Sequence, residues 1–328
     1  MTELRLSFAM GDYDRTRPIA DGRVKIDGVD PIVMLQTPEE MFFRAFRDQA
    51  VDVTELSLSS YCVSVARGDP PYVAVPVHLS RAFRHSAVYV RDDRGIEAPE
   101  DLKDRRVGIA EWQLTANVWV RAILADHGLA PGDVRWVRGG MNAPGRTEKI
   151  ALDLPPEIRI EQAPEGATLD AMLREGEIDG FVGPRSPRAF DEGHPRIRRL
   201  FRDPTAAAEA WYARTRIFPI MHVLGVRASL AAAHPWLPGA LLKAFTEAKR
   251  LAEEALFDTA VPKVTMPFVE DALARARALD PHLWSYGAAP AAHVLDYFLE
   301  QHHRQGLSSR RLAVGELFHP STYESFSL

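Results

Sequence analysis

SRAFRHSAVYVR (residues 80–91) begins with cations and ends in an apolar run. The second half has the composition of a buried strand, whereas Arg81, Arg84 and His85 place two fixed charges and a titratable ring directly before it. A second apolar run with strand composition, IFPIMHVLGVR (217–227), lies much further along the chain. We interpret these two stretches as the places where the chain crosses between two lobes.

Short β-rich runs alternate with helical patterns on both sides of the first stretch. LRLSFAM (4–10) and VDVTELS (51–57) read as strands, and TANVWVRAILADHG (115–128) reads as an amphipathic helix that ends at a glycine. Such alternation is typical of an α/β fold with largely parallel strands. We therefore expect two α/β lobes: lobe I from residues 1–86 plus 222–328, and lobe II from residues 87–221.

Composition narrows the classes of function. The formal net charge of −5, with acidic and basic residues mixed, gives no electrostatic reason to expect a nucleic acid or an acidic membrane as a partner. No run of about eighteen apolar residues occurs, so no transmembrane helix is expected. The start, MTELRLSFAMGDYDR, leads straight into an apolar strand and does not look like a targeting segment. A single cysteine, Cys62, cannot form an internal disulfide, and we expect a cytoplasmic protein.

Eight segments occur in this order along the chain: GDYDRTRPIADGRV, ELSLSSY, SRAFRHSAVYVR, RRVGIAEWQLTANVWVRAIL, VRWVRGG, IFPIMHVLGVR, HPWL and QGLSSRRLAVGELFHPST. Together they resemble the 4,5-dihydroxyphthalate decarboxylase family. The resemblance implies a two-lobed type II periplasmic-binding-protein-like fold with a ligand cleft between the lobes and two interlobe crossings. It also implies a cofactor-independent lyase of aromatic catabolism, which converts 4,5-dihydroxyphthalate to protocatechuate and CO2 in phthalate degradation.

One segment departs from the family pattern. Where the resemblance implies Trp-Pro-Tyr-Gly followed by an Asn-Arg pair, the chain has HLWSYGAAPAAHVL (282–295), with Ala292 and His293 in place of the pair. A lyase acting on a different aromatic or heterocyclic acid is therefore an open alternative, including a remote likeness to thiamine-pyrimidine synthases. The other alternative is a non-catalytic solute-binding or sensor protein that captures a small anion.

The implied reaction requires cations that orient a dianionic aromatic substrate. A planar guanidinium matches a carboxylate in a bidentate manner and stays charged. Arg84, Arg81 and Arg15 are the candidate anchors, and Arg185 follows another expected strand, from which we expect it to close over the ligand. An ion pair from Arg15 to Asp12 or Asp14 is the alternative, and both carboxylates are equally candidate acceptors for the catechol hydroxyls.

Proton transfer points to His222 and His85, because histidine titrates near physiological pH. His222 lies inside an otherwise apolar strand, where the alternative is a buried histidine satisfied by a backbone carbonyl. Glu111 is a candidate to accept from a hydroxyl or to orient a histidine. No H-x-x-x-H, H-E-x-x-H or C-x-x-C occurs, so we expect no dedicated metal site, although a site assembled from distant segments is left open.

Two further stretches are expected to open helices directly after strands. Free backbone N–H groups at a helix start favour an anion. Gln113 and Thr115 in EWQLTANVW are therefore candidate ligands for a second carboxylate, with Thr115 doubling as the cap or serving as a cap alone. Ser57 and Ser59 in SLSS (57–60) also stand where a strand leads into a helix, so they are candidate substrate-binding residues. The expected ligand is a small anionic aromatic acid, and a homo-oligomer is left open.

Overall fold

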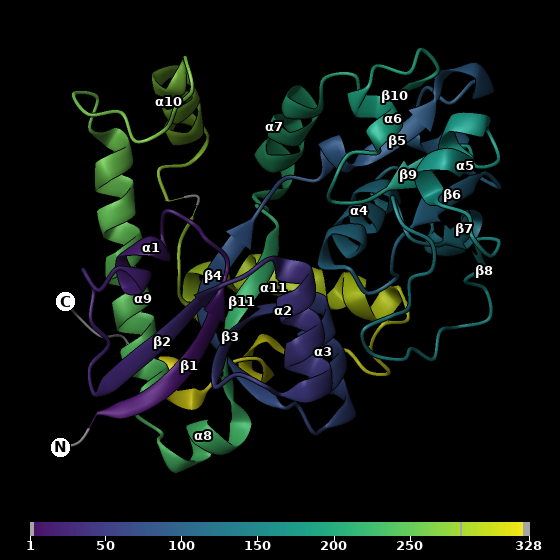
Figure 1. Ribbon diagram of the computed structural model, residues 1–328. Coiled ribbons are helices and arrows are strands. Elements are labelled where there is room, and N and C mark those ends of the chain that lie inside the picture. The colour runs from purple at the N-terminus through teal and green to yellow at the C-terminus, as the bar shows by residue number, and fades with distance from the viewer. Residues whose placement is uncertain (1–2, 283, 324–328) are drawn as a thin grey trace. The chain divides into compact units, whose positions relative to one another are not determined.

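The computed structural model describes residues 3–282 and 284–323, and its contacts divide the chain into two units (Figure 1). Unit 1 comprises residues 1–81, 220–296 and 313–328. Unit 2 comprises residues 82–219 and 297–312.

Unit 1 is built on a five-stranded sheet in the order β2-β1-β3-β11-β4. β1 pairs in parallel with β2 and β3, whereas β11 is antiparallel to β3 and β4. The carboxyl ends of β1, β2 and β3 therefore lie at one edge of the sheet. The strands are β1 (Leu4–Met10), β2 (Val29–Leu35), β3 (Val53–Ser57), β4 (Tyr72–Arg81) and β11 (Ile220–Arg227).

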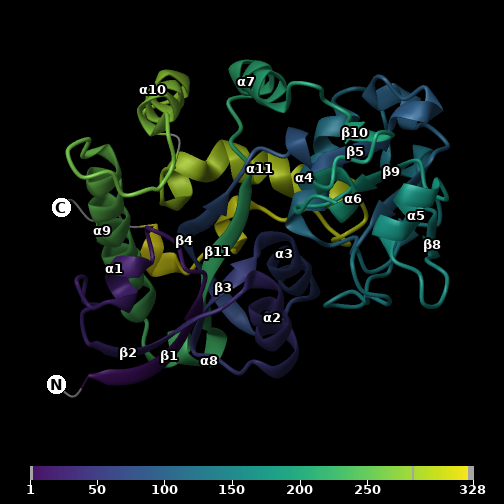
Figure 2. The ribbon, with the colours of Figure 1, turned by 45° about the horizontal axis from the view of Figure 1, so that its top comes forward.

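Helices cover both faces of this sheet. α9 carries Leu237, Leu241 and Phe245 on one apolar stripe, and this stripe joins the core formed by alternate side chains of β1 and β4. α2 adds Met41 and Phe42 to a smaller core on the other face (Figures 1 and 2). The helices of unit 1 are α1 (Arg17–Ala20), α2 (Pro38–Phe43), α3 (Leu58–Arg67), α8 (Ala228–Ala233), α9 (Leu237–Phe257) and α10 (Val269–Leu279). α11 (Ala288–Arg304) begins in unit 1, and its residues from Tyr297 onward belong to unit 2.

Unit 2 contains a six-stranded sheet in the order β10-β5-β9-β6-β7-β8. β6, β7, β8 and β9 are mutually parallel where they pair, and β5 is antiparallel to β9 and β10. Leu169 and Leu173 of α5 pack on Phe181 of β9 in its core. The elements are β5 (Val88–Arg91), β6 (Arg106–Ile109), β7 (Arg135–Arg138), β8 (Ile160–Gln162), β9 (Gly180–Val182), β10 (Ile197–Arg199), α4 (Thr115–Ala125), α5 (Leu169–Glu175), α6 (Arg188–Asp191) and α7 (Pro204–Thr215).

The chain changes unit after residues 81, 219, 296 and 312. The first two points lie within five residues of the expected crossings at 86/87 and 221/222. The other two were not expected, because residues 297–312 were placed in lobe I. They belong to unit 2 because Tyr297 stacks on Trp119 and Gln305 accepts a hydrogen bond from the buried Arg121.

Candidate active site

Polar side chains gather where β1 and β3 end in unit 1. Gly11 and Tyr13 follow β1, and Ser57 is the last residue of β3. His222 on β11 is paired with Ser57, and the pairing of β11 with β4 is irregular on both sides of His222. Such irregularities re-aim side chains. In α/β sheets the carboxyl ends of strands are where ligands bind, so this edge is a candidate site.

A buried carboxylate, Glu55, lies at the centre of this group. Glu55 Oε1 is 2.6 Å from His222 Nδ1 and accepts from the Tyr13 hydroxyl at 2.8 Å, while Oε2 accepts from the Gly11 amide at 2.9 Å. The Glu55 side chain is fully buried, whereas that of His222 is 17% exposed. Because Nδ1 is bound to Glu55, Nε2 is the imidazole nitrogen that can exchange a proton with a substrate.

The environment keeps Glu55 ionised. Burial acts to raise the pKa of its carboxyl, but the hydrogen bond and charge of His222, together with hydrogen bonds from Gly11 and Tyr13, outweigh burial and lower the pKa. A carboxylate held in this way orients the imidazole through Nδ1. The pair can therefore act as a proton donor or acceptor.

Two aromatic rings complete the surroundings of this pair. Phe42 meets the His222 imidazole edge-on, with ring centroids 4.8 Å apart. Burial, followed by the negative charge of Glu55, raises the pKa of Tyr13, which therefore remains a neutral donor. A Cβ atom on Gly11 would lie 2.4 Å from the Tyr13 ring, so this close approach requires glycine.

Glu55 was missed in the sequence analysis, although a signal was present. It lies in VDVTELS (51–57), an apolar strand of the same kind as the one that drew attention to His222. A carboxylate inside an expected core strand needs a partner, since an unpaired buried charge is costly. A search for a cationic or hydrogen-bonding partner of Glu55 would have considered His222.

Glu111, the carboxylate singled out from the sequence, lies in unit 2 after β6 and is fully buried. Arg146 donates to its Oε1 at 2.6 and 2.9 Å, and Lys149 Nζ is bonded to its Oε2. Burial lowers the pKa of Lys149, and the adjacent Glu111 carboxylate acts in the opposite direction. Among the described residues, Glu111 therefore forms ion pairs with two cations and none with a histidine. It secures the loop that follows β7.

Gln113 and Thr115 lie beside the same loop. Glu148 accepts from the Trp112 amide and from the Gln113 side-chain amide at 2.9 Å, and the Gln113 amide also donates to the Ile150 carbonyl at 2.7 Å. The expectation that Thr115 caps the helix is wrong. α4 begins at Thr115 and its N-cap is Leu114, because helical geometry starts one residue earlier than a threonine cap at position 115 requires.

His85 lies in a short 3₁₀ turn, His85–Ala87, in unit 2. Its ring is 2% exposed and packs edge-on against Phe201 and Trp211, with centroids 5.2 and 5.6 Å away. Burial, with a smaller contribution from His127, lowers the pKa of His85 to about 4, so it is neutral at pH 7. Burial also lowers the pKa of the neighbouring Arg84 to about 10, which still leaves Arg84 charged.

Arg15 and Asp12, in the loop after β1, take part in local contacts. The Arg15 guanidinium lies between the Tyr13 and Trp284 rings, 4.2 and 4.3 Å from their centroids. It also donates to the Leu79 carbonyl at 2.8 Å and pairs with Asp14 at 2.9 Å. The alternative of an Arg15 ion pair with Asp12 or Asp14 is therefore confirmed for Asp14, whereas Asp12 pairs with Arg17 at the surface.

The remaining candidates are spread over both units. Ser57 is buried beside His222, Ser59 is buried within α3, and Arg81 is buried at the end of β4. Arg185 is exposed and follows β9 in unit 2, where it lines a polar pocket of about 530 Å³.

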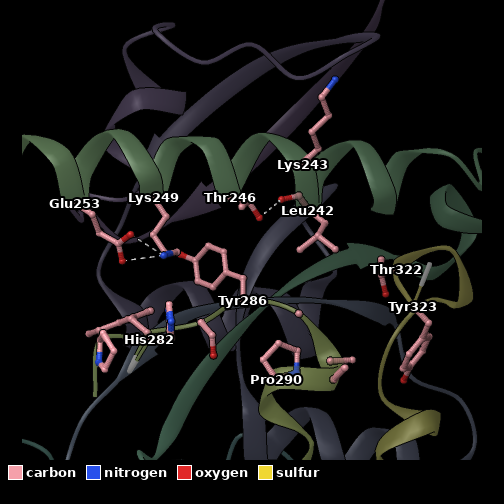
Figure 3. Close-up of a pocket in the computed structure, with 16 residues that line it drawn as sticks. Leu242, Lys243, Thr246, Lys249, Glu253, His282, Tyr286, Pro290, Thr322 and Tyr323 are labelled. Atoms are coloured by element: carbon pink, nitrogen blue, oxygen red, sulfur yellow. Dashed lines mark hydrogen bonds and ion pairs between the residues drawn. The ribbon is translucent and has the colours of Figure 1, made fainter. Parts of the chain in front are cut away.

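Another pocket, of about 570 Å³, lies within unit 1 between α9 and residues 281–290. Figure 3 shows the Tyr286 ring directed toward Lys249, which pairs with Glu253 at 2.8 Å, while Lys243 points away from them. Part of the segment that departs from the family pattern thus lines a pocket. Ala292 and His293 are themselves exposed on α11.

Two further features of the described residues concern metal binding and membrane crossing. Within residues 3–282 and 284–323, His, Cys, Asp and Glu side chains nowhere gather in a group of three able to hold a metal ion. None of the helices in the same residues combines the length and apolar character that crossing a bilayer requires.

Comparison with solved structures identifies the fold. The alkanesulfonate-binding protein SsuA from Xanthomonas axonopodis pv. citri, bound to MOPS, superposes with a TM-score of 0.55 at 13% identity, covering 97% of this chain and 98% of that one. The Candida albicans CA3427 gene product, described as having the generic periplasmic binding protein fold, gives 0.55 at 9% identity, covering 100% and 99%. The expected periplasmic-binding-protein fold is confirmed.

Sequence comparison gives nearer relatives. The 4,5-dihydroxyphthalate decarboxylase of Comamonas testosteroni is 58% identical over 330 residues, covering 100% of both chains. The protein of the same name from Pseudomonas putida is 58% identical over 213 residues, covering 65% of this chain and 83% of the relative. A family model described as NMT1/THI5 like matches residues 77–150.

Proposed function

This chain belongs to the 4,5-dihydroxyphthalate decarboxylase family, and we propose that it converts 4,5-dihydroxyphthalate to protocatechuate and CO2. The support from sequence is 58% identity along the full length of the Comamonas testosteroni relative. The support from the structure is the Glu55–His222 pair, in which a buried carboxylate holds an imidazole that is still partly exposed.

The chemistry of this substrate needs a proton donor at one ring carbon. Loss of the proton from the hydroxyl para to a carboxylate-bearing carbon pushes electron density onto that carbon. The carbon takes a proton, and the bond to the carboxylate then breaks. The electron pair of that bond returns to the ring, CO2 leaves, and the phenolate is restored and reprotonated. The phenol supplies the electrons, so the reaction in principle needs no cofactor.

We assign the proton donor to His222. The Glu55 carboxylate lies 2.6 Å from Nδ1 and fixes the orientation of the imidazole. Nε2 then presents the proton to the ring carbon. His85 suits this role less well, because burial lowers its pKa to about 4 and leaves it without a proton to donate at pH 7.

Other residues remain part of the proposal as binding groups. Ser57 is next to His222 on the paired strand and is offered as a hydrogen-bond partner for a substrate oxygen. Arg84 and Arg185 are offered as carboxylate ligands, since both guanidinium groups carry a fixed charge. A small aromatic acid as the ligand and a cytoplasmic location belong to the same proposal.

Incubation of the purified protein with 4,5-dihydroxyphthalate tests the reaction directly. We expect stoichiometric release of CO2 and protocatechuate, followed by gas analysis and chromatography, and we expect the rate to survive prior treatment with EDTA. Stabilisation against heat by this compound without turnover would instead favour a binding protein. Neither turnover nor stabilisation would mean that the substrate is a different acid.

The role of His222 is tested by His222→Ala. We expect kcat to fall by about 10²- to 10⁴-fold, the usual contribution of a positioned acid, while the far-UV spectrum and unfolding midpoint stay close to those of the parent. His293→Ala, which changes an exposed histidine on α11, is the matched control. Normal turnover in a well-folded His222→Ala protein would remove His222 from the mechanism.

A further inference from the structure

The polar pocket of unit 2 is assembled at the ends of several strands. Its volume is about 530 Å³, within the range of small-molecule sites. Ser86 lies in the turn before β5 and Tyr89 near the start of β5, Arg185 and Ser186 follow β9, and Arg199 ends β10. Because β5 is antiparallel to β9 and β10, these positions meet at one end of the sheet.

Arg199 is held in place by neutral groups. It is paired with Tyr89 across the β10–β5 ladder, and the Tyr89 hydroxyl is hydrogen-bonded with Arg199 and Ser186. The guanidinium lies 5.2 Å from the centre of the Phe190 ring. Its Nε is buried without a hydrogen-bond partner among the described residues. Arg199 is therefore kept in position by a hydroxyl and an aromatic ring. Because both groups are neutral, they leave the positive charge of Arg199 available to a ligand in the pocket.

The charges around the pocket favour an anion. Arg185 and Arg199 contribute two positive charges, and Asp191 contributes one negative charge. The Asp191 carboxylate already accepts a hydrogen bond from the Ser186 hydroxyl at 2.7 Å. Ser86 and Asn142 add neutral polar groups to the lining. Two guanidinium groups with polar neighbours are the usual means of binding a carboxylate in a specific orientation.

We propose that the Arg185–Arg199 pocket binds the carboxylate of a small organic acid. Arg199 supplies a fixed fork, and Arg185, which is exposed at the mouth, supplies a second cation that closes on the bound acid. The inference does not depend on the proposed reaction, because a carboxylate is recognised whether or not it is later lost.

Arginine modification by phenylglyoxal, read by peptide mass spectrometry, tests the site locally in the full-length protein. The probe is phthalate, which has the two carboxylates without the hydroxyls, and catechol is the control that has the hydroxyls alone. At a phthalate concentration of about ten times its Kd, mass action slows modification of Arg185 about tenfold. Arg188, three residues away, exposed and outside the pocket lining, is the internal control and is expected to react at an unchanged rate.

Two substitutions link the protection to this pocket. Arg199→Gln and Arg185→Gln each lower phthalate affinity about ten- to hundredfold, as expected for loss of a charged hydrogen-bond donor. Arg185→Gln changes an exposed residue and keeps the test valid if Arg199→Gln folds poorly. Arg188→Gln makes the same change of charge nearby and leaves the affinity as it was.

Steady-state kinetics then distinguish whether the bound acid is the substrate itself or a separate acid. A raised KM for 4,5-dihydroxyphthalate in Arg185→Gln with kcat retained identifies the acid as the substrate. An unchanged KM in Arg185→Gln, together with its lowered phthalate affinity, identifies it as a separate acid. The proposal is overturned if phthalate leaves Arg185 modification unchanged, if Arg185 and Arg188 are protected equally, or if catechol protects as well as phthalate.

Discussion

At the scale of single residues, the contact between Glu55 and His222 makes a specific prediction. Glu55→Gln keeps the shape of the side chain but removes the charge that orients the imidazole. We expect kcat to fall by about 10²-fold or more with KM little changed, because the lost interaction matters for proton transfer. Steady-state kinetics on 4,5-dihydroxyphthalate measures this. Glu40→Gln, an exposed carboxylate on α2, is the control.

The same substitution changes how stability depends on pH. Interactions in the folded state hold the pKa of Glu55 below its ordinary value of about 4.3. The stabilisation is therefore fully present above that value and is lost as the pH falls through the folded-state pKa. Urea unfolding between pH 6 and 3 should show a steeper loss of stability in the parent than in Glu55→Gln. Equal slopes would mean that Glu55 is not preferentially ionised in the folded protein.

Gly11 is the second residue whose role can be isolated. A methyl group at this position would overlap the Tyr13 ring, which donates to Glu55. We expect Gly11→Ala to lower the free energy of unfolding by about 1–3 kcal/mol, the usual cost of overpacking, and to reduce kcat. Combining it with Tyr13→Leu removes the overlapping ring. The two changes should then be non-additive in urea unfolding, and simple additivity would contradict the steric explanation.

At the scale of elements, the turn His85–Ala87 packs against α7 through His85 and Trp211. Burial lowers the pKa of His85 to about 4, while an unfolded histidine titrates near about 6.5. The unfolded chain therefore binds the extra proton first, and stability falls as the pH drops from 6.5 to 4, by about 3 kcal/mol. His85→Phe should flatten this part of the curve in urea unfolding. His78, whose pKa burial lowers to about 3, is present in both proteins, so their difference isolates His85.

Elements with a strong pattern were predictable from the sequence, and short ones were not. The strand expected at residues 4–10 is β1 in full, and the apolar stripe of α9 marks its buried face. β8 and β10 have three residues each, too few to show a period of two. Their strand geometry comes from pairing with β7 and β5, which local sequence does not encode.

The same distinction holds for the candidate site. His222 was predictable because a polar histidine inside an apolar strand needs a hydrogen-bond partner or has a function. Glu55, inside the apolar strand β3, offered the same signal. The partners of Glu111 were not predictable. Arg146 and Lys149 come from the stretch 139–166, whose glycines, prolines and charges indicate only a loop. Which loop cations reach a buried carboxylate depends on tertiary packing.

At the scale of the whole molecule, the return of residues 297–312 to unit 2 makes that unit depend on a distant part of the chain. Gln305 accepts from the buried Arg121 at 2.7 Å and, through its carbonyl, from the Trp112 indole at 3.1 Å. Phe298 packs on Trp119, with ring centroids 5.1 Å apart. A fragment lacking these residues would leave the Arg121 Nε without its acceptor, although Nη2 still donates to the Trp112 carbonyl, and would leave two tryptophans without these contacts.

We therefore expect a fragment of residues 82–219 to unfold without a cooperative transition and to bind a hydrophobic dye. The same fragment joined to residues 297–312 by a flexible Gly/Ser linker should unfold cooperatively in urea. A third version with Gln305→Ala in the joined segment should lose part of this stability, about 1–3 kcal/mol, because the buried Arg121 Nε then lacks its acceptor. Cooperative unfolding of residues 82–219 alone, with the midpoint of the joined fragment, would show that unit 2 is complete without the C-terminal segment, as the sequence had indicated.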